Sequence, residues 1–226
     1  MSLKWDAANR RWELNGRKVT LQQQANLRNE LADMYSKYLR HEADLYNAGK
    51  LEFANWRANS ERYILEATGN GYQFGRGGVV NMSDADYDRL ARTLNKQVEL
   101  FQNFAEEVRT GQLSVAQIAA RAESYGGSVV YAHEQALNQA ASGDDPNADW
   151  ELPYFPGDGD TSCMSRCRCS WEITEDEYAW TCIYHTMGDE QMCADCIARG
   201  QQYGTDSPLV FPKANRPNPI RDMEAA

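Results

Sequence analysis

The segment from Arg76 to Leu137, which opens with R-G-G-V-V-N-M-S (residues 76–83), carries strong helical patterns. Ser83, followed three residues later by Asp86, predicts a helix start, because each side chain can bond the other residue's backbone amide. Gly111 predicts the end of this helix. Between these points apolar residues recur every three or four positions, as on one face of a helix: Tyr87, Leu90, Leu94, Val98, Phe101, Phe104 and Val108.

A second helix is predicted directly after this break, with Ser114 and Gln117 as its cap. Its expected buried residues are Val115, Ile118, Ala122, Tyr125, Val129 and Leu137. A short connection makes two such helices antiparallel neighbours. The stretch therefore predicts a helical hairpin with a buried seam, which by itself indicates a core and no particular function.

Two more helices are predicted upstream. Thr20 with Gln23 caps the first, which ends at Gly49, and the second covers residues 51–68. The expected inward residues are Leu27, Leu31, Met34, Tyr35, Tyr38 and Leu45 on the first helix and Phe53, Trp56, Tyr63 and Ile64 on the second. Four helices with short connections predict a bundle-like body over residues 21–142.

Residues 1–20 predict a β-hairpin, because Asn15-Gly16 supplies a tight turn between two short alternating runs. A lone ribbon of this kind is marginally stable. Its tryptophans, Trp5 and Trp12, are therefore candidates for contacts with the helices or with a partner.

Five glycines fall within residues 69–78 and predict a long turn between two helices. A phosphate-binding loop is disfavoured, because no strand precedes the glycines and no Gly-Lys-Ser/Thr follows them. Arg76 in this turn is a candidate partner-binding residue, with a solvated surface arginine as the alternative.

Proline and charge divide the chain of 226 residues at the same place. All seven prolines lie at or after Pro146, and residues 1–142 carry 17 acidic and 17 basic side chains. Residues 143–226 carry 16 acidic and 6 basic side chains, which accounts for the net charge of −10. The negative charge disfavours nucleic-acid binding. The chain shows neither an apolar run long enough for a membrane span nor a signal peptide, so synthesis in a reducing cytoplasm is expected.

The predicted fold is thus mainly α. An N-terminal hairpin (1–20) and the helical body (21–142) precede a cysteine-rich acidic α+β module (143–207) and an extended, proline-rich C-terminal arm (208–226). In the module, residues 169–173 and 178–184 alternate like paired strands, and residues 193–202 predict a short helix.

All six cysteines fall between residues 163 and 196. The spacing C-x-x-x-C-x-C covers Cys163, Cys167 and Cys169, and C-x-x-C covers Cys193 and Cys196. Zinc takes about four soft or borderline ligands. Closely spaced pairs of cysteines can supply them at a low cost in the conformational entropy of the chain. A structural zinc site is therefore predicted from Cys193, Cys196 and two of the first three cysteines. Cys182 and His185 form a reserve C-x-x-H pair.

Other uses of these residues stay open. An even number of cysteines in a compact module also fits disulfides formed after release from the cell, and free thiols are a third possibility. A catalytic zinc would need an open position and an acid such as Asp189 or Glu190 nearby. His41 and His133 lie within predicted helices without a second ligand at metal-binding spacing, so we expect structural or surface histidines there.

Several segments resemble a group of minor structural proteins encoded by tailed bacteriophages. These segments are RGGVVNMSDADYDRL (76–90), QVELFQNFAEEV (97–108), GQLSVAQIAARAESY (111–125), PGDGDTSCMSRCRCSWE (156–172) and CADCIAR (193–199). The piece C-R-C-S-W (167–171) is also similar to the cysteine-containing end of phage Mu F-like minor head proteins. In that family C-x-x-C precedes C-R-C, whereas here it follows.

The resemblance implies a non-enzymatic minor head or head–tail connector protein, carried in the virion in several copies. It implies contacts with portal, major capsid or neck proteins and brings no catalytic residues with it. Two other classes remain as alternatives: a zinc-dependent, nuclease-like enzyme and a redox-responsive binding protein.

Overall fold

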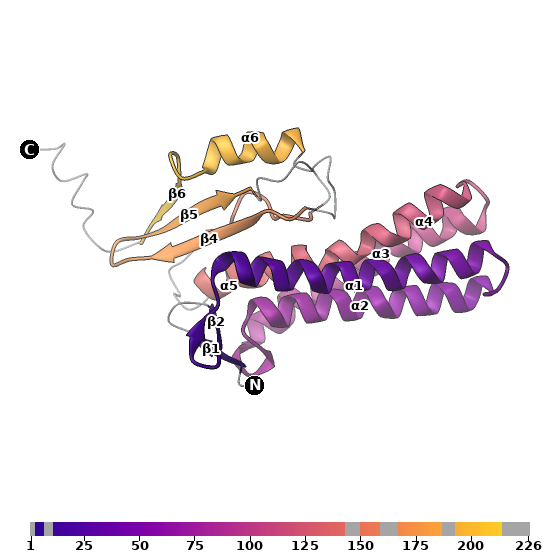
Figure 1. Cartoon of the computed structure of the whole chain (residues 1–226), viewed down its shortest axis with the longest axis horizontal. Helices are drawn as coiled ribbons and strands as arrows, with labels where there is room; N and C mark the ends of the chain where they lie inside the picture. Colours follow the sequence, from indigo (N-terminus) through magenta and orange to yellow (C-terminus); the bar gives the residue numbers. More distant parts are fainter. Residues whose placement is uncertain (1–2, 7–10, 143–149, 159–166, 187–192, 214–226) are drawn as a thin grey trace, which may run out of the picture.

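The computed structural model describes residues 3–6, 11–142, 150–158, 167–186 and 193–213. A long helical body carries a small sheet with its own helix beside one end (Figure 1). The helices are α1 (Leu21–Asn47), α2 (Phe53–Gly75), α3 (Asp84–Arg109), α4 (Val115–Ser124), α5 (Ser128–Ser142) and α6 (Ala194–Tyr203), with 3-10 turns η1 (Val79–Asn81) and η2 (Tyr125–Gly127). The strands are β1 (Leu3–Asp6), β2 (Arg11–Leu14), β3 (Arg17–Lys18), β4 (Ser170–Glu175), β5 (Ala179–His185) and β6 (Leu209–Pro212). The predicted mainly α fold with a small cysteine-containing α+β part is confirmed.

The three predicted capping boxes form and set the starts of α1, α3 and α4. At α3, the Asp86 carboxylate accepts from the Ser83 amide at 2.7 Å, and the Ser83 hydroxyl accepts from the Asp86 amide at 3.3 Å. Amides at a helix start lack partners within the helix, so these side chains satisfy them locally. This explains why short-range sequence patterns located the helix starts.

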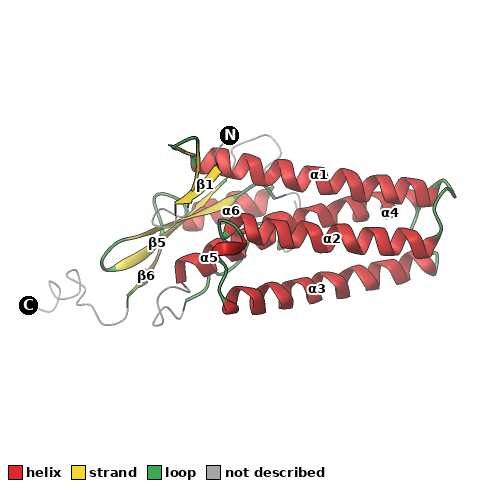
Figure 2. Cartoon of the chain, turned by 90° about the horizontal axis from the view of Figure 1, so that it is seen from below, coloured by secondary structure: helices red, strands yellow, loops and turns green. Residues whose placement is uncertain are grey.

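The helices α1 to α4 run lengthwise along the body (Figure 2). Aromatic side chains make up much of the core that these helices share. Trp56 lies at its centre, with ring centroids 5.7 Å from Phe101 and 5.8 Å from Phe104, and all three side chains are fully buried. Four predicted inward residues are instead exposed: Leu27, Tyr38, Tyr87 and Val115. The buried side of α1 combines apolar and polar residues, so large apolar side chains alone were a poor guide to its orientation: Gln24, Ala25, Arg28, Ala32, Tyr35, Leu39, Glu42 and Ala43.

The predicted glycine-rich turn is wrong, because α2 continues through it to Gly75. A Cβ on Gly71 would lie 2.4 Å from the Val129 carbonyl oxygen, and one on Gly75 would lie 2.5 Å from that of His133. Two of the glycines therefore let the end of α2 approach the backbone of α5, although glycine disfavours a helix interior. The turn is confined to residues 76–78, where Gly77 and Gly78 have positive φ.

The predicted fourth helix is two helices, α4 and α5, separated by the 3-10 turn η2. A Cβ on Gly126 in this turn would meet the Ser36 hydroxyl at 2.2 Å and the Ala32 carbonyl oxygen at 2.8 Å. The interruption therefore lies where the chain crosses α1 in close contact. It directs α5 toward the sheet-containing end of the molecule (Figure 1).

The N-terminal ribbon has three antiparallel strands in the order β1-β2-β3, one more than the predicted hairpin. Asn15 and Gly16 both have positive φ, as a tight primed turn requires. Trp5 lies opposite Trp12 in the register. The Trp12 ring stacks on Phe74 at the end of α2, with centroids 5.8 Å apart. The ribbon is thus docked on the helical body.

The second sheet is antiparallel in the order β4-β5-β6, with α6 packed against β5 (Figure 1). Leu209–Pro212, within the segment predicted as an extended arm, pairs with β5 as β6. Pro212 is compatible with this position because β6 is an edge strand. The remainder of the predicted arm, residues 214–226, lies outside the described residues.

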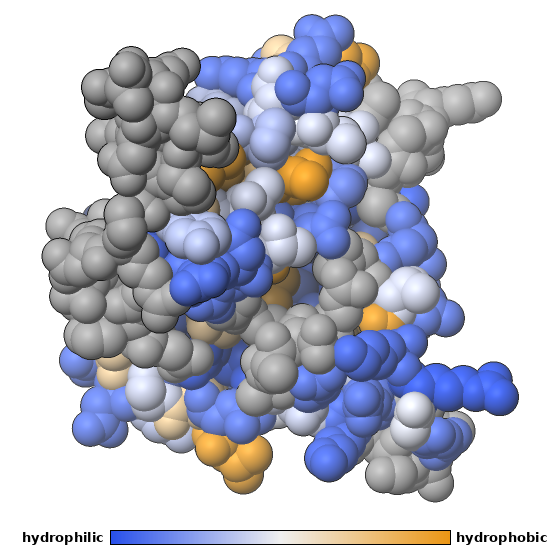
Figure 3. Space-filling model, turned by 90° about the vertical axis from the view of Figure 1, so that its left-hand side faces the viewer, coloured by the Kyte–Doolittle hydropathy of each residue, from blue (hydrophilic) through white to orange (hydrophobic). Residues whose placement is uncertain are grey.

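The face shown in Figure 3 is mainly hydrophilic where its residues are described, and the hydrophobic side chains on it stand apart from one another. Among the described residues, the most exposed large hydrophobic side chain is that of Val80, at 93%. Within the described ranges, every helix is too short or too polar to cross a membrane.

Candidate metal centre

Three cysteine sulfurs converge between the sheet and α6. The Sγ atoms of Cys167, Cys169 and Cys196 all lie within 4.8 Å of one another, and Cys167 and Cys196 are 3.7 Å apart. All three side chains are buried. The prediction from spacing is thus confirmed to this extent: members of the C-x-C and C-x-x-C pairs, far apart in sequence, form one group.

Local backbone geometry explains how each pair contributes. Cys167 and Cys169 precede β4, and residues two apart in an extended segment point to the same side. Cys193 is the N-cap of α6, and its sulfur accepts a hydrogen bond from the Cys196 amide at 3.4 Å. This bond folds the C-x-x-C sequence into a tight turn and brings Cys196 onto the first turn of the helix.

The distances suit a tetrahedral thiolate site. Zinc binds cysteine sulfur at about 2.3 Å, so two sulfurs on one zinc ion lie about 3.8 Å apart. The 3.7 Å between Cys167 and Cys196 matches this edge length. Soft thiolate donors favour zinc, copper(I) or iron over magnesium or calcium. The donor set therefore fits a zinc ion with three thiolates and one further ligand.

The surroundings favour neutral thiols when no cation is bound. A hydrogen bond with Cys167, together with burial, raises the pKa of both the Cys169 and the Cys196 thiols. Burial also raises the pKa of the Tyr184 hydroxyl, which donates to Cys196 Sγ at 3.7 Å. A bound cation reverses this preference, because it stabilises the thiolates directly. Metal binding here would therefore release protons.

An aromatic layer encloses the sulfur group. Trp171 lies 5.2 Å from Tyr184 and 5.7 Å from Tyr154 between ring centroids, and its indole nitrogen donates to the Tyr154 carbonyl oxygen. The Arg199 guanidinium lies over the Tyr154 ring, 3.8 Å from its centroid, and 3.6 Å from the Asp158 carboxylate. These side chains keep water from the sulfurs, which is typical of a structural rather than a catalytic metal site.

The remaining predicted ligands take different positions. Cys163 lies outside the described residues, as do Asp189 and Glu190. Cys193 is half-buried and lies outside the group of mutually close sulfurs. The five described cysteines form no disulfide.

The reserve pair does not form a site. Cys182 is fully buried on one face of β5, whereas His185 lies on the opposite face with its ring nitrogen 2.9 Å from Glu172. Residues three apart in a strand point to opposite sides, so C-x-x-H within a strand cannot chelate one ion.

The candidate partner-binding residues are used within the chain. Trp12 stacks on Phe74 and its indole nitrogen donates to the Phe74 carbonyl oxygen at 3.2 Å. Trp5 lies over Gly77, where an added Cβ would meet its ring at 2.1 Å. Arg76 is buried and forms an ion pair with Asp86 at 3.0 Å. Arg76 is therefore neither a solvated residue nor an available surface contact, whereas partner binding by the tryptophans stays a prediction.

Sequence reasoning missed a buried ion pair beside the sulfur group. Arg28 of α1 and Glu134 of α5 are both fully buried and bonded to each other. Burial would raise the pKa of Glu134, but the neighbouring His133 and Arg28 hold it below its usual range. The sequence contained a signal for only one member of this pair. Glu134 lies on the same side of its helix as Leu137, which was expected to be buried, whereas no neighbouring residue in the sequence marks Arg28 as buried.

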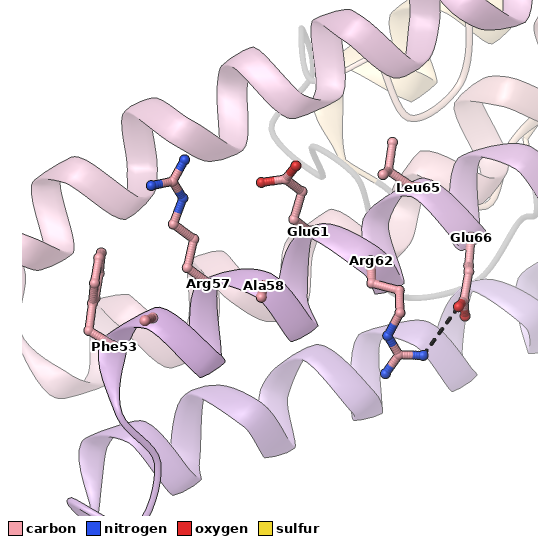
Figure 4. Close-up of a pocket in the computed structure, with 8 residues that line it drawn as sticks. Phe53, Arg57, Ala58, Glu61, Arg62, Leu65 and Glu66 are labelled. Atoms are coloured by element: carbon pink, nitrogen blue, oxygen red, sulfur yellow. Dashed lines mark hydrogen bonds and ion pairs between the residues drawn. The ribbon is translucent and has the colours of Figure 1, made fainter.

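A shallow groove of about 720 Å³ runs along α2, away from the sulfur group. Phe53, Arg57, Glu61 and Leu65 project to one side of this helix, and Arg62 pairs with Glu66 at 3.2 Å (Figure 4). All eight lining residues belong to α2, and they include neither cysteine nor histidine. The groove therefore offers no nucleophile paired with an imidazole base, and the group of three possible metal ligands found among the described residues lies elsewhere.

The sulfur group is accordingly the strongest candidate site in the described part of the chain. Comparison of the sequence and structure with protein-family models, curated proteins and solved structures found no match.

Proposed function

We propose that this protein is a non-enzymatic structural component of a tailed-phage virion whose cysteine-rich module is held together by a structural zinc ion. It would act as a minor head or head–tail connector protein, in several copies, against portal, major capsid or neck subunits. Cys167, Cys169 and Cys196 would supply three ligands. Cys193 or Cys163 would supply the fourth.

The observation that carries the metal part is the convergence of three buried sulfurs within 4.8 Å. Four-thiolate zinc sites that are closed to water serve structure, whereas catalytic zinc keeps an open position for water or substrate. In the described ranges this group contains thiols alone, without a carboxylate or imidazole that could transfer protons. A closed centre therefore supports a stabilising role over the nuclease-like alternative.

The virion part is supported by the resemblance of residues 76–125 and of the cysteine segments to minor structural proteins of tailed phages. The acidic character of residues 143–226 favours a basic partner surface over packaged DNA. The cross-linked module would add stability to a region with a small apolar core of its own.

Two measurements test this proposal. Metal analysis of the purified full-length protein should find one zinc per chain, and protein mass spectrometry of purified phage particles should find the chain together with cross-links to portal, capsid or neck proteins. Absence of zinc contradicts the metal part. Absence of the chain from particles contradicts the virion part, whatever the metal content.

One observation favours the redox-responsive alternative. With 3.7 Å between their sulfurs, Cys167 and Cys196 could lose two electrons and two protons to an oxidant such as dioxygen and form a disulfide. Mass spectrometry of particles after alkylation under denaturing conditions distinguishes the two. Structural zinc predicts that these cysteines are recovered as alkylated thiols, whereas the alternative predicts their recovery as a disulfide.

A further inference from the structure

A buried ion pair connects the helical body to the segment that carries two of the three convergent cysteines. Arg28 Nη1 donates to Glu134 Oε1, and both side chains are fully shielded from solvent. The guanidinium also bonds the neighbouring Asn29 side chain at 3.0 and 3.1 Å. The pair is thus held in one arrangement within the body.

Each member of the pair also bonds the backbone of the cysteine segment. Arg28 Nη2 donates to the Arg168 carbonyl oxygen at 3.0 Å, and Glu134 Oε2 accepts from the Trp171 amide at 3.0 Å. Arg168 lies between Cys167 and Cys169, and Trp171 is the second residue of β4. The two contacts therefore lie on either side of Cys169.

The chemistry of these contacts makes them directional. The strand β4 is at the edge of its sheet, so the Trp171 amide that points away from β5 needs a partner, and Glu134 provides it. Hydrogen bonds to ionised groups are stronger than those between neutral groups. Because both charges are desolvated, neither can exchange its protein partners for water.

We propose that Arg28 and Glu134 are positioning residues for the metal centre. They hold the segment from Cys167 to Cys169 against α1 and α5, in the geometry that meets Cys196 from α6. This inference rests on the zinc site proposed above. It adds that contacts with the helical body control the affinity of that site for metal. Metal occupancy and docking of the module on the helical body are linked, so each strengthens the other by the same factor.

The test is a zinc-binding titration of the full-length protein against a competing chelator dye. Glu134→Gln preserves the size of the side chain but removes its charge, and groups that orient metal ligands typically contribute about 10- to 100-fold in affinity. We expect the zinc dissociation constant to rise by at least about tenfold in this variant. The absorption of the cobalt(II)-substituted protein should change as well, since it reports the geometry of the sulfur ligands.

Asp86→Asn is the matched control. It disrupts a second buried ion pair, Arg76–Asp86, whose further bonds go to Tyr72, Ser83 and Asn81 within the helical body. This variant should lower thermal stability while leaving the zinc dissociation constant within about twofold of the wild-type value. A loss of affinity equal to that of Glu134→Gln would show a general effect of destabilisation and would overturn the inference.

The remaining outcomes separate the two proposals. A wild-type protein that binds no zinc overturns the proposed metal site and this inference with it. A wild-type protein that binds zinc while Glu134→Gln binds it equally tightly overturns the positioning role alone. If Glu134→Gln does not fold, Arg28→Lys tests the same contacts. It retains a charge beside Glu134, but its single ammonium lacks the planar fork that reaches Arg168, and an unchanged affinity in this variant would also refute the positioning role.

Discussion

Gly71 of α2 lies directly against the backbone of Val129 in α5, so that a Cβ on Gly71 would stand 2.4 Å from the Val129 carbonyl oxygen and 2.8 Å from its Cα. Backbone atoms cannot move aside as the end of a flexible side chain can. This contact fixes the distance between the end of α2 and α5, the helix that carries Glu134 toward the sulfur group.

We expect Gly71→Ala to lower the free energy of unfolding by about 1–3 kcal/mol, as overpacking of a tight interface does. Gly69→Ala is the control, because Gly69 lies in the same helix with open space around its Cβ position. That change should raise the free energy by about 0.4–1 kcal/mol, since alanine favours the helix. Urea unfolding followed by circular dichroism measures both, and two changes of the same sign would contradict the described packing.

We expect Cys196→Ser to abolish stoichiometric zinc binding, because Cys196 is the member of the group supplied by α6. Cys182→Ala is the matched control, since Cys182 is buried in the same module but lies outside the group. It should retain one zinc per chain. Metal analysis after dialysis measures both variants, and equal zinc losses in the two would place the site elsewhere.

Acid should destabilise the fold partly through His133. Burial lowers the pKa of this histidine, despite the opposing effect of Glu134. The unfolded chain therefore binds the proton more readily than the folded chain. The stability that neutral His133 contributes is fully present above its unfolded pKa of about 6.5, and it is lost as the pH falls toward the lower pKa of the folded state. Between pH 7.5 and pH 5, the melting temperature of His133→Gln should decrease less than that of the wild type.

The control for this measurement is His41→Gln, because His41 is exposed on α1. It should preserve the full wild-type decline of the melting temperature. A decline in His133→Gln as steep as in the wild type would assign the acid sensitivity to other groups.

Trp12 should contribute to stability through both its ring and its indole nitrogen. Trp12→Phe preserves a ring over Phe74 but loses the hydrogen bond to the Phe74 carbonyl oxygen, which should cost about 1 kcal/mol. Trp12→Ala loses both and should cost about 2–3 kcal/mol, less than a fully buried tryptophan because this one is half-buried. Urea unfolding measures both; unchanged stability in Trp12→Ala would show that the ribbon does not depend on this contact.

The parts of the fold that could be predicted depend on neighbouring residues in the sequence. Ser83 and Asp86 bond each other's amides within one turn, so a stretch of four residues suffices to locate the start of α3. The Cys196 amide donates a hydrogen bond to the Cys193 sulfur, and this bond folds the C-x-x-C sequence into a turn. The spacing of the two cysteines was therefore enough to predict a tight turn. The turn at Asn15 and Gly16 was predicted correctly for the same reason, because its backbone conformation depends on these two residues alone.

The parts that could not be predicted depend on residues far away in the chain. Gly71 and Gly75 suggested a loop because glycine weakens a helix, and only α5 packed against them makes their missing side chains favourable. The break at Gly126 depends in the same way on Ser36 of α1. The prolines of the C-terminal segment predicted an extended arm. That residues 209–212 pair with β5 depends on a strand far away in the sequence.

Local sequence patterns were enough to predict that this protein is mainly helical, where most of its helices begin, and that its cysteine sulfurs belong to one acidic module. Which of these sulfurs meet, and which charges are buried beside them, depends on contacts between segments far apart in the chain. Helix caps and turns are satisfied within a few residues, so their signals are local. A buried ion pair such as Arg28–Glu134 is stable only when distant segments exclude water from it together, and no short stretch of sequence records that exclusion.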